Sequence, residues 1–142
     1  MKAYLGSKKK PVGKNKEFNR GLIMSDCLFC KIIAGDIPSK KVYEDDEYLA
    51  FWDIAPKAPV HILLIPKKHV TSLYHLDDSN VSVVQGMMSK APEIAKLMEL
   101  NDGFRAVVNT GDGGGQEVGH IHFHILGDVR KATWSGFPLQ DN

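Results

Sequence analysis

Three histidines occupy alternate positions in an apolar segment near the C-terminal end of the chain. His120, His122 and His124 are separated by single isoleucine or phenylalanine residues. This alternation is the period of a β-strand, so we expect the three imidazoles to share one face. Imidazole can act near neutral pH as a nucleophile, general acid, general base or metal ligand. The segment therefore predicts a site for catalysis or for metal binding.

The chain contains two cysteines, Cys27 and Cys30, in a C-x-x-C pair. Two cysteines are too few for a secreted, disulfide-stapled domain. A tetrahedral zinc site would need two further ligands, and the candidates are His61, His69, His75 and the three alternate histidines. The pair also suits a redox dithiol, but the chain lacks the strand followed by a long helix in which that motif occurs.

A glycine-rich segment, residues 109–116, leads into the histidines within a few positions. Consecutive glycines let backbone N–H groups converge on an anion, although most such runs are plain turns. The segment also lacks the Lys-Ser/Thr ending of a phosphate-binding P-loop. Its position nonetheless favours an anion held beside an imidazole.

The remaining segments predict an α+β fold on a mostly antiparallel sheet. A short helix should follow Asp26 and end at Gly35. Apolar residues recur at three- and four-residue steps between Ser79 and Leu100, which predicts an amphipathic helix that Pro92 should kink. The expected strands are residues 42–44, 48–52, 61–65 and 104–109 and the histidine segment.

The 142 residues suit one domain, predicted here as residues 25–142 after a disordered N-terminal arm, residues 1–24. The arm holds seven of the 18 basic residues and one of the 17 acidic residues, which leaves 11 basic and 16 acidic residues in the domain. An acidic domain argues against nucleic-acid binding. Without a bilayer-length apolar run or a secretory signal, we expect no membrane partner and a location in the cytoplasm or nucleus.

Several segments resemble the Hint branch of the histidine triad (HIT) family, whose motif is His-φ-His-φ-His-φ-φ with φ apolar. The similar segments are residues 27–38, 43–54, 58–69, 107–115 and 116–127. The resemblance runs from about Asp26 to Trp134. It implies a HIT-like fold, with a roughly five-stranded, mostly antiparallel sheet and one long and one short helix. It also implies a homodimer whose two sheets join into one.

The activity implied by this resemblance is hydrolysis of purine nucleoside phosphoramidates, such as AMP or GMP joined to an amine, through a nucleotidyl-histidine intermediate. The implied nucleophile is His122. His124 would contact the phosphate and assist proton transfer, and His61 and His120 would complete the catalytic cluster. The alternatives are a dinucleoside polyphosphate hydrolase, a metal-dependent hydrolase, and a zinc-stabilised interaction module with vestigial catalysis.

The resemblance also implies a nucleotide site. Asp53 would accept hydrogen bonds from the ribose hydroxyls, and Trp134 would reach toward the partner's pocket. The apolar slot for the purine would consist of Leu28, Phe29, Ile32, Phe51, Ile54 and Leu63. The phosphate would face Asn109, Gly115, Gln116, Glu117 and Val118.

By the same resemblance, Cys27, Cys30, His69 and His120 would bind a structural zinc ion, and the chemistry itself would require no metal. Two positions depart from the common family pattern. Glu117 stands where many eukaryotic members have serine, so we expect an altered leaving-group preference. Gly119 replaces a larger residue and should loosen the start of the histidine strand.

Overall fold

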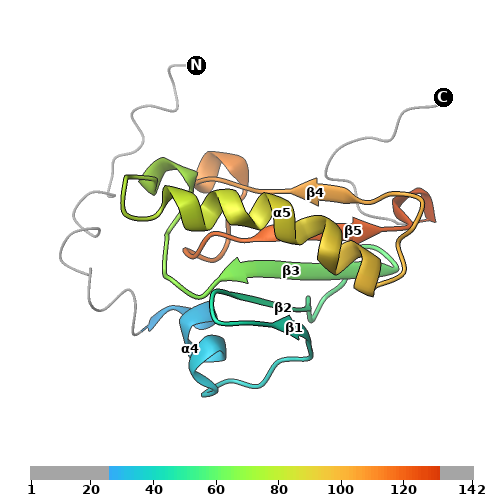
Figure 1. Cartoon of the computed structure of the whole chain (residues 1–142), viewed down its shortest axis with the longest axis horizontal. Helices are drawn as coiled ribbons and strands as arrows, with labels where there is room; N and C mark the ends of the chain where they lie inside the picture. The colour runs from blue at the N-terminus through green and yellow to red at the C-terminus, as the bar shows by residue number, and fades with distance from the viewer. Residues whose placement is uncertain (1–25, 132–142) are drawn as a thin grey trace.

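Five antiparallel strands form one sheet in the order β1-β2-β3-β5-β4, as Figure 1 shows. The computed structural model describes residues 26–131, so the predicted arm and Trp134 lie outside the described residues. The predicted α+β, HIT-like arrangement of a five-stranded sheet with one long and one short helix is confirmed. The elements are α4 (Leu28–Ala34), β1 (Lys41–Glu44), β2 (Tyr48–Trp52), β3 (Val60–Pro66), α5 (Val81–Leu97), β4 (Arg105–Val107) and β5 (Phe123–Gly127), with short 3₁₀ turns η1 (Leu73–His75), η2 (Asp112–Gly114) and η3 (Val129–Lys131).

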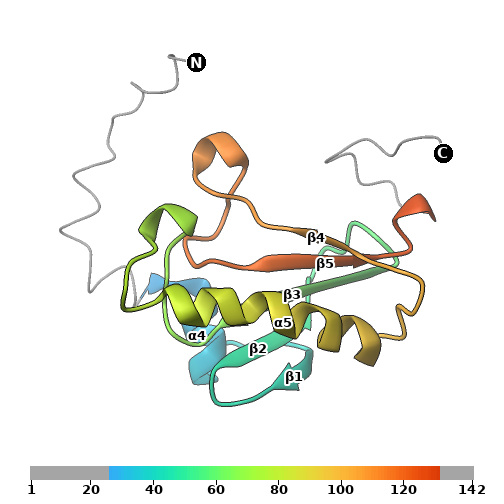
Figure 2. The same cartoon turned by 45° about the horizontal axis from the view of Figure 1, so that its top comes forward.

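Both faces of the sheet are covered, which explains the continuous apolar runs of its central strands. Along β2, Tyr48 and Ala50 pack in the larger core cluster with α5, whereas Leu49 and Phe51 pack in a smaller cluster with α4. The directly paired residues of β3 follow the same division. The sheet therefore separates an α5 face from an α4 face, and Figure 2 shows α5 running along its own side of the strands.

The long helix α5 begins after Asn80 and continues through Pro92 to Leu97, slightly shorter than the predicted helix. Its apolar stripe faces the sheet because these positions recur with the helical period. No helix within the described part of the chain is both long and apolar enough to cross a membrane. The buried residues of α5 are Val84, Met87, Ala91, Ile94 and Ala95.

Gly86 allows α5 to approach β2 closely. A Cβ atom at this position would meet the Tyr48 hydroxyl, which donates a hydrogen bond to the Val83 carbonyl at 2.6 Å. We expect Gly86→Ala to lower the free energy of unfolding by about 1–3 kcal/mol, because overpacking outweighs the better helix propensity of alanine. Urea unfolding would measure this, with Gly113→Ala, where a Cβ meets open space, as the control. Equal stability of the two variants would contradict the expectation.

The prediction that all three alternate histidines lie on one strand is wrong. Strand β5 begins at Phe123, so only His124 lies within it. The β3–β5 pairing ends where Leu64 faces Phe123, and β3 itself ends at Pro66. Proline has no N–H group to continue the ladder. The Pro66 carbonyl accepts a hydrogen bond from the ring of His120 instead, at 2.8 Å.

The predicted alternation of faces nevertheless persists before β5 begins. The Ile121 side chain is fully buried in the cluster with α5, and its N–H donates to the Val70 carbonyl at 2.7 Å. The rings of His120 and His122 contact Phe29 of α4 on the other face. The tertiary core therefore fixes which way these side chains point without a regular strand.

Candidate active site and metal site

Two cysteines and two histidines converge where α4 begins. Potential ligand atoms of Cys27, Cys30, His69 and His120 all lie within 4.8 Å of one another. The Cys30 Sγ lies 3.3 Å from Nδ1 of His69, and the Cys27 Sγ lies 3.4 Å from Nδ1 of His120. Two thiols and two imidazoles are a ligand set that tetrahedral zinc prefers.

The surroundings of these four residues suit a zinc ion. Nε2 of His120 donates to the Pro66 carbonyl at 2.8 Å, and Nε2 of His69 lies 3.3 Å from the Thr71 hydroxyl. Each ring therefore keeps a hydrogen bond at Nε2 and presents Nδ1 to the thiols, as metal-binding histidines do. Burial lowers the pKa of His120 to about 4 and raises the pKa of Cys30 to about 12. A cation between the sulfurs would favour their thiolate forms.

The middle histidine of the motif, His122, is held in one tautomer. Its Nδ1 lies 2.8 Å from the His120 carbonyl, and a carbonyl can only accept a hydrogen bond, so Nδ1 carries the proton. Nε2 of the neutral ring is then a lone pair. Burial lowers the pKa of His122 and favours this neutral form, although the charges of Asp53 and Glu117 partly oppose the shift. His122 therefore has the protonation state of a nucleophile.

His61 and His124 are linked in a defined direction. The Lys57 backbone N–H donates to Nδ1 of His61 at 3.0 Å, so Nε2 of His61 carries the proton. This Nε2 lies 2.9 Å from Nδ1 of His124 and donates to it, which leaves the proton of His124 on its own Nε2. That buried Nε2 has no acceptor among the described residues. A buried donor without a partner is costly, so a ligand that accepts from it would be stabilised.

Asp53 lies beside this pair. One carboxylate oxygen is 3.5 Å from Nε2 of His61, and the other accepts the Ala55 N–H at 2.8 Å. Asp53, His61 and His124 form a second group close enough to hold a metal. However, the Lys57 N–H places the His61 proton on Nε2, the atom that would have to bind the ion. With its proton on Nε2, His61 is better suited to exchanging protons with His124 and Asp53 than to binding a metal ion with them.

Acid should destabilise the fold through this pair. Burial lowers the pKa of His124 from 6.5 to about 4 and also lowers that of His61. The unfolded chain therefore takes up protons first, so this contribution to stability is complete above pH 6.5 and is lost as the pH falls toward 4. We expect a slope of up to about 1.4 kcal/mol per pH unit for each group, measurable by urea unfolding between pH 7.5 and 4.5. His124→Gln should flatten the profile, and an unchanged slope would contradict this assignment.

The predicted purine slot is partly assembled. Five of its six members lie on α4 or on the sheet strands that α4 faces, where Phe29 and Phe51 meet edge to face with ring centroids 5.6 Å apart. Ile54 does not join them, because its side chain is 99% exposed in the loop after β2. Leu28 is also largely exposed, at 43%. The buried slot members are Phe29, Ile32, Phe51 and Leu63.

The predicted phosphate loop runs from Asn109 to Val118 beside the histidines and contains the 3₁₀ turn η2. The side chain of Gln116 bonds to the protein backbone. Its Oε1 accepts the Gly111 N–H at 2.9 Å, and its Nε2 donates to the carbonyls of Thr71 at 2.7 Å and Val118 at 2.9 Å. Glu117 is exposed. The Gln116 amide therefore shapes the loop. The N–H groups of Gly111, Gly114, Gly115 and Gln116 already donate within it, so a phosphate would have to use other N–H groups of the loop.

Gln116→Glu tests the contribution of this amide. The glutamate could still accept from Gly111, but its second oxygen would face the carbonyls of Thr71 and Val118 with no proton to donate. We expect a loss of about 1–3 kcal/mol in the free energy of unfolding, the usual cost of unsatisfied polar groups. Glu117→Gln is the matched control and should change stability by less than about 0.5 kcal/mol. Equal effects in urea unfolding would contradict this role.

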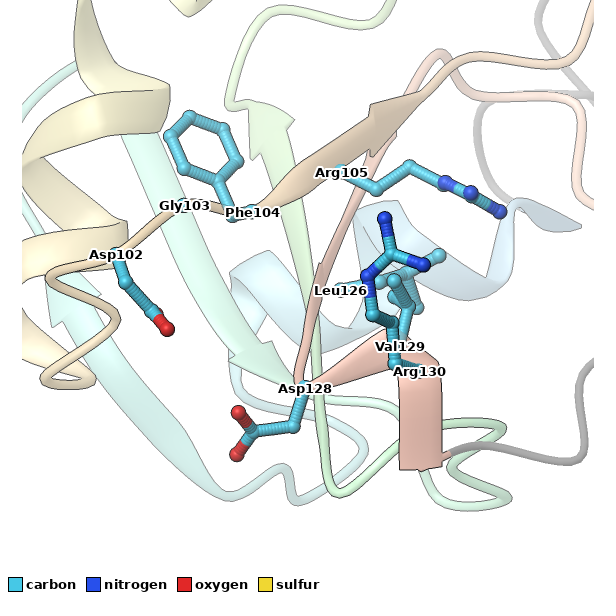
Figure 3. A pocket seen from close by; sticks show the side chains of 8 residues that line it. All are labelled: Asp102, Gly103, Phe104, Arg105, Leu126, Asp128, Val129 and Arg130. Carbon is cyan, nitrogen blue, oxygen red and sulfur yellow. The ribbon is translucent and has the colours of Figure 1, made fainter. Parts of the chain in front are cut away.

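A surface cavity of about 480 Å³ lies at the other end of β5 from His122. Figure 3 shows the guanidinium groups of Arg105 and Arg130 near each other, with Asp102 and Asp128 on another side. Arg105 lies opposite Leu126, which in turn lies opposite His61 across β3 and β5, so the cavity adjoins the histidine face of the sheet. No histidine lines it. The acid–base chemistry therefore belongs to the histidine cluster and not to this cavity.

Several contributors to the site could not be seen in the sequence. The Lys57 N–H and the carbonyls of Pro66 and His120 fix imidazole tautomers through the backbone, and backbone groups carry no residue-type signal. Thr71 contributes its hydroxyl to His69 and its carbonyl to Gln116. Of the predicted residues, the structure brings together Cys27, Cys30, His69 and His120 in one group and His61 with His124 in another, whereas Ile54 does not join the slot.

Comparison with known proteins agrees with the fold and the histidine motif. The HIT domain model matches residues 34–131. The chain is 54% identical over 104 residues to protein HitA of Neisseria gonorrhoeae, covering 73% of this chain and 97% of that protein. It is 45% identical to a 14 kDa zinc-binding protein of Brassica juncea, covering 77% of this chain and 97% of the relative.

Solved structures give the same result. The crystal structure of a HIT family hydrolase from Legionella pneumophila superimposes with a TM-score of 0.71 at 45% identity, covering 78% of this chain and 99% of the other. A histidine triad protein from Clostridium difficile gives a TM-score of 0.70 at 46% identity, covering 82% and 96% of the two chains. With this fold, motif and similarity, the chain belongs to the HIT family.

Proposed function

We propose that this protein hydrolyses purine nucleoside phosphoramidates, such as AMP or GMP joined to an amine, through a nucleotidyl-His122 intermediate. The observation that supports this most strongly is that the neighbouring rings of His122 and His124 differ at Nε2: one offers a lone pair and the other offers an N–H group. His122 has a lone pair at Nε2, and His124 has a buried N–H with no acceptor in the part of the chain that the structure describes. The ring centroids of the two histidines are 5.0 Å apart. A nucleophile beside a donor is what attack on a phosphoryl group requires.

In the first step, Nε2 of His122 attacks the α-phosphorus, a P–N bond forms to the ring, and the P–N bond to the amine breaks. The leaving nitrogen takes up one proton. The Nε2–H of His124 donates to a phosphoryl oxygen and stabilises its charge. In the second step, water attacks phosphorus, the bond to His122 breaks, and one proton is released. The products are the nucleoside monophosphate and the free amine.

The proton that the leaving amine takes up in the first step and the proton that water releases in the second can be exchanged with the same group. We assign this role to the His61–His124 pair. The negative charge of a bound phosphate would raise the pKa of His124 from its low value in the free protein. The carboxylate of Asp53, 3.5 Å from His61, would stabilise the protonated pair. In the same proposal Asp53 also accepts the ribose hydroxyls, for which a carboxylate has enough lone pairs.

The Cys27, Cys30, His69 and His120 cluster is a structural zinc site. The zinc-binding relative and the histidine tautomers support this assignment. When bound, the ion supplies a structural cross-link, and the lone pair of His122 takes no part in holding it. The phosphoryl chemistry therefore needs no metal.

We further propose the domain boundaries 25–142, a homodimer, and a cytoplasmic or nuclear location. Strand β4 lies at the edge of the sheet and pairs only with β5 among the described strands. An unpaired edge can extend the sheet into a second copy. Exposed apolar side chains at Met88, Leu97 and Phe104 suit such burial. In this dimer Trp134 would approach the partner's nucleotide slot.

The decisive experiment compares AMP release from an adenosine 5′-phosphoramidate of a small amine with AMP release from diadenosine tri- and tetraphosphate. We expect at least a tenfold higher kcat/KM for the phosphoramidate, retained when free metal is chelated. Preference for the dinucleotides would favour the polyphosphate hydrolase alternative. Loss of turnover on chelation, in protein that stays folded, would favour a metal-dependent hydrolase. A folded protein that turns over neither substrate would overturn the proposal.

A further inference from the structure

One residue, His120, takes part in both the metal site and the active site. The Nδ1 of its ring faces the thiols of Cys27 and Cys30 at 3.4 and 3.6 Å. Its backbone carbonyl accepts the Nδ1–H of His122 at 2.8 Å. An ion that fixes the His120 ring therefore also fixes the carbonyl on which the tautomer of His122 depends.

Phe29 makes a second connection between the two sites. It lies between the two cysteines in sequence, and Cys27 caps the helix that carries it, accepting the Cys30 N–H at 3.3 Å. Its ring meets the ring of His122 edge to face, with centroids 5.1 Å apart, and approaches that of His120 at 5.9 Å. Phe29 is 3% exposed and belongs to the proposed purine slot. The position of α4 therefore decides both the wall of the slot and the packing of the nucleophile.

The attachment of α4 to the sheet is limited. The helix has seven residues and buries only Phe29 and Ile32. These side chains join the smaller of the two core clusters, whereas α5 packs in the larger one. The metal ligands come from three segments that are distant in the sequence. Cys30 meets His69 across 39 positions, and Cys27 meets His120 across 93. A cross-link among them would restrain α4 in addition to this apolar cluster.

We propose that the metal site and the nucleotide site are positively coupled, with metal binding fixing α4, Phe29 and His120 in the arrangement that binds the nucleotide. This inference rests on the proposed nucleotide site and adds a regulatory property to it. Because coupling is reciprocal, the metal should raise affinity for AMP and AMP should raise affinity for the metal by the same factor. We expect a factor of about ten, within the usual range for coupled sites.

Calorimetric titration of AMP into the full-length protein tests the first half of this reciprocity, with metal-free and zinc-loaded samples compared. Cobalt tests the second half, because tetrahedral Co²⁺ bound to thiolates absorbs visible light. The affinity for Co²⁺ would be measured from this absorption with and without AMP. Circular dichroism would confirm that α5 and the sheet remain folded in the metal-free sample. We expect both affinities to rise about tenfold.

Two variants make the result specific. Cys30→Ser removes a ligand by exchanging only its sulfur for oxygen, at a position that packs against the slot cluster but is not one of the predicted slot members. Zinc should no longer change the affinity of this variant for AMP. If zinc still strengthens AMP binding to this variant, the ion acts on the nucleotide phosphate in solution and the coupling is overturned. Phe29→Leu keeps all four ligands, so it should bind Co²⁺ with the same spectrum while the coupling factor falls toward one. Comparing the coupling factors of Phe29→Leu and the wild-type protein then isolates the part of the coupling that passes through Phe29.

The remaining outcomes separate the coupling from the proposed function. Equal AMP affinity in metal-free and zinc-loaded wild-type protein would overturn the coupling and leave the phosphoramidase proposal intact. Absence of AMP binding in both forms would overturn the proposed nucleotide site, and the coupling with it. An affinity for Co²⁺ that does not rise in the presence of AMP would likewise overturn the coupling, because each ligand of a coupled pair must strengthen binding of the other.

Discussion

His122→Ala should lower kcat for an adenosine phosphoramidate by about 10⁴-fold or more, because it removes the atom that forms the covalent intermediate. The hydrogen bond from Nδ1 to the His120 carbonyl leaves Nε2 as the attacking lone pair. The ring of His122 also lies beside the Nε2–H of His124, which has no acceptor within residues 26–131. Steady-state release of AMP would measure the loss. The affinity for AMP should change much less, since His122 contributes little to the slot.

A covalent test distinguishes loss of the nucleophile from general damage. Wild-type protein mixed with substrate and quenched in alkaline denaturant should carry a nucleotidyl group on the peptide that contains His122, and His122→Ala should not. His75→Ala is the matched control, because His75 lies on the exposed turn η1 with its ring hydrogen-bonded to the Ser72 hydroxyl and has no assigned role in the reaction, and it should retain wild-type turnover. Trapped nucleotide on another residue, or residual activity within tenfold of wild type, would contradict the proposed mechanism.

The sequence predicted the elements well where a single physical rule governs them. The apolar periodicity of α5 and the acidic turn between β1 and β2 depend on local pattern, and both elements occur close to the predicted positions. The histidine segment follows two competing rules. Alternation predicted a strand from His120 onward, but the β3–β5 ladder stops at Leu64 and Phe123 although β3 continues to Pro66. The Ile121 N–H donates to the Val70 carbonyl, and the Pro66 carbonyl accepts from the ring of His120. The extent of a strand depends on how it pairs with its neighbour in the fold, and the sequence of the histidine segment alone does not contain that information.

The candidate site shows the same limit. The four metal ligands could be named from a resemblance, and they do lie together. The roles of individual nitrogen atoms could not be named, because they depend on backbone groups such as the Lys57 N–H and the His120 carbonyl. Ile54 was expected in the purine slot, yet its side chain points into solvent in this single chain. Residue types predicted which side chains gather, and the fold decides the direction of each hydrogen bond.

Removal of the metal should have the largest effect on stability. Four ligands from three distant segments surround the site, and binding to the folded chain alone adds its full free energy to stability. A structural ion bound at a thousandfold excess over its Kd contributes about 4 kcal/mol, which for a domain of this size corresponds to a fall in Tm of roughly 10 °C or more on chelation. Differential scanning calorimetry with and without a chelator would measure the shift.

The same chelation should affect chemistry far less, which separates a structural ion from a catalytic one. The ion would be held by His120 and its three partners, while the lone pair of His122 points elsewhere. At saturating phosphoramidate, and below the lowered Tm, we expect kcat to fall less than about threefold, although KM should rise if the two sites are coupled. Cys30→Ser should reproduce both the lower Tm and the retained kcat. A hundredfold fall in kcat with an unchanged Tm would instead place the ion in the reaction. It would contradict the assignment of metal binding to His120 and of metal-free nucleophilic attack to His122.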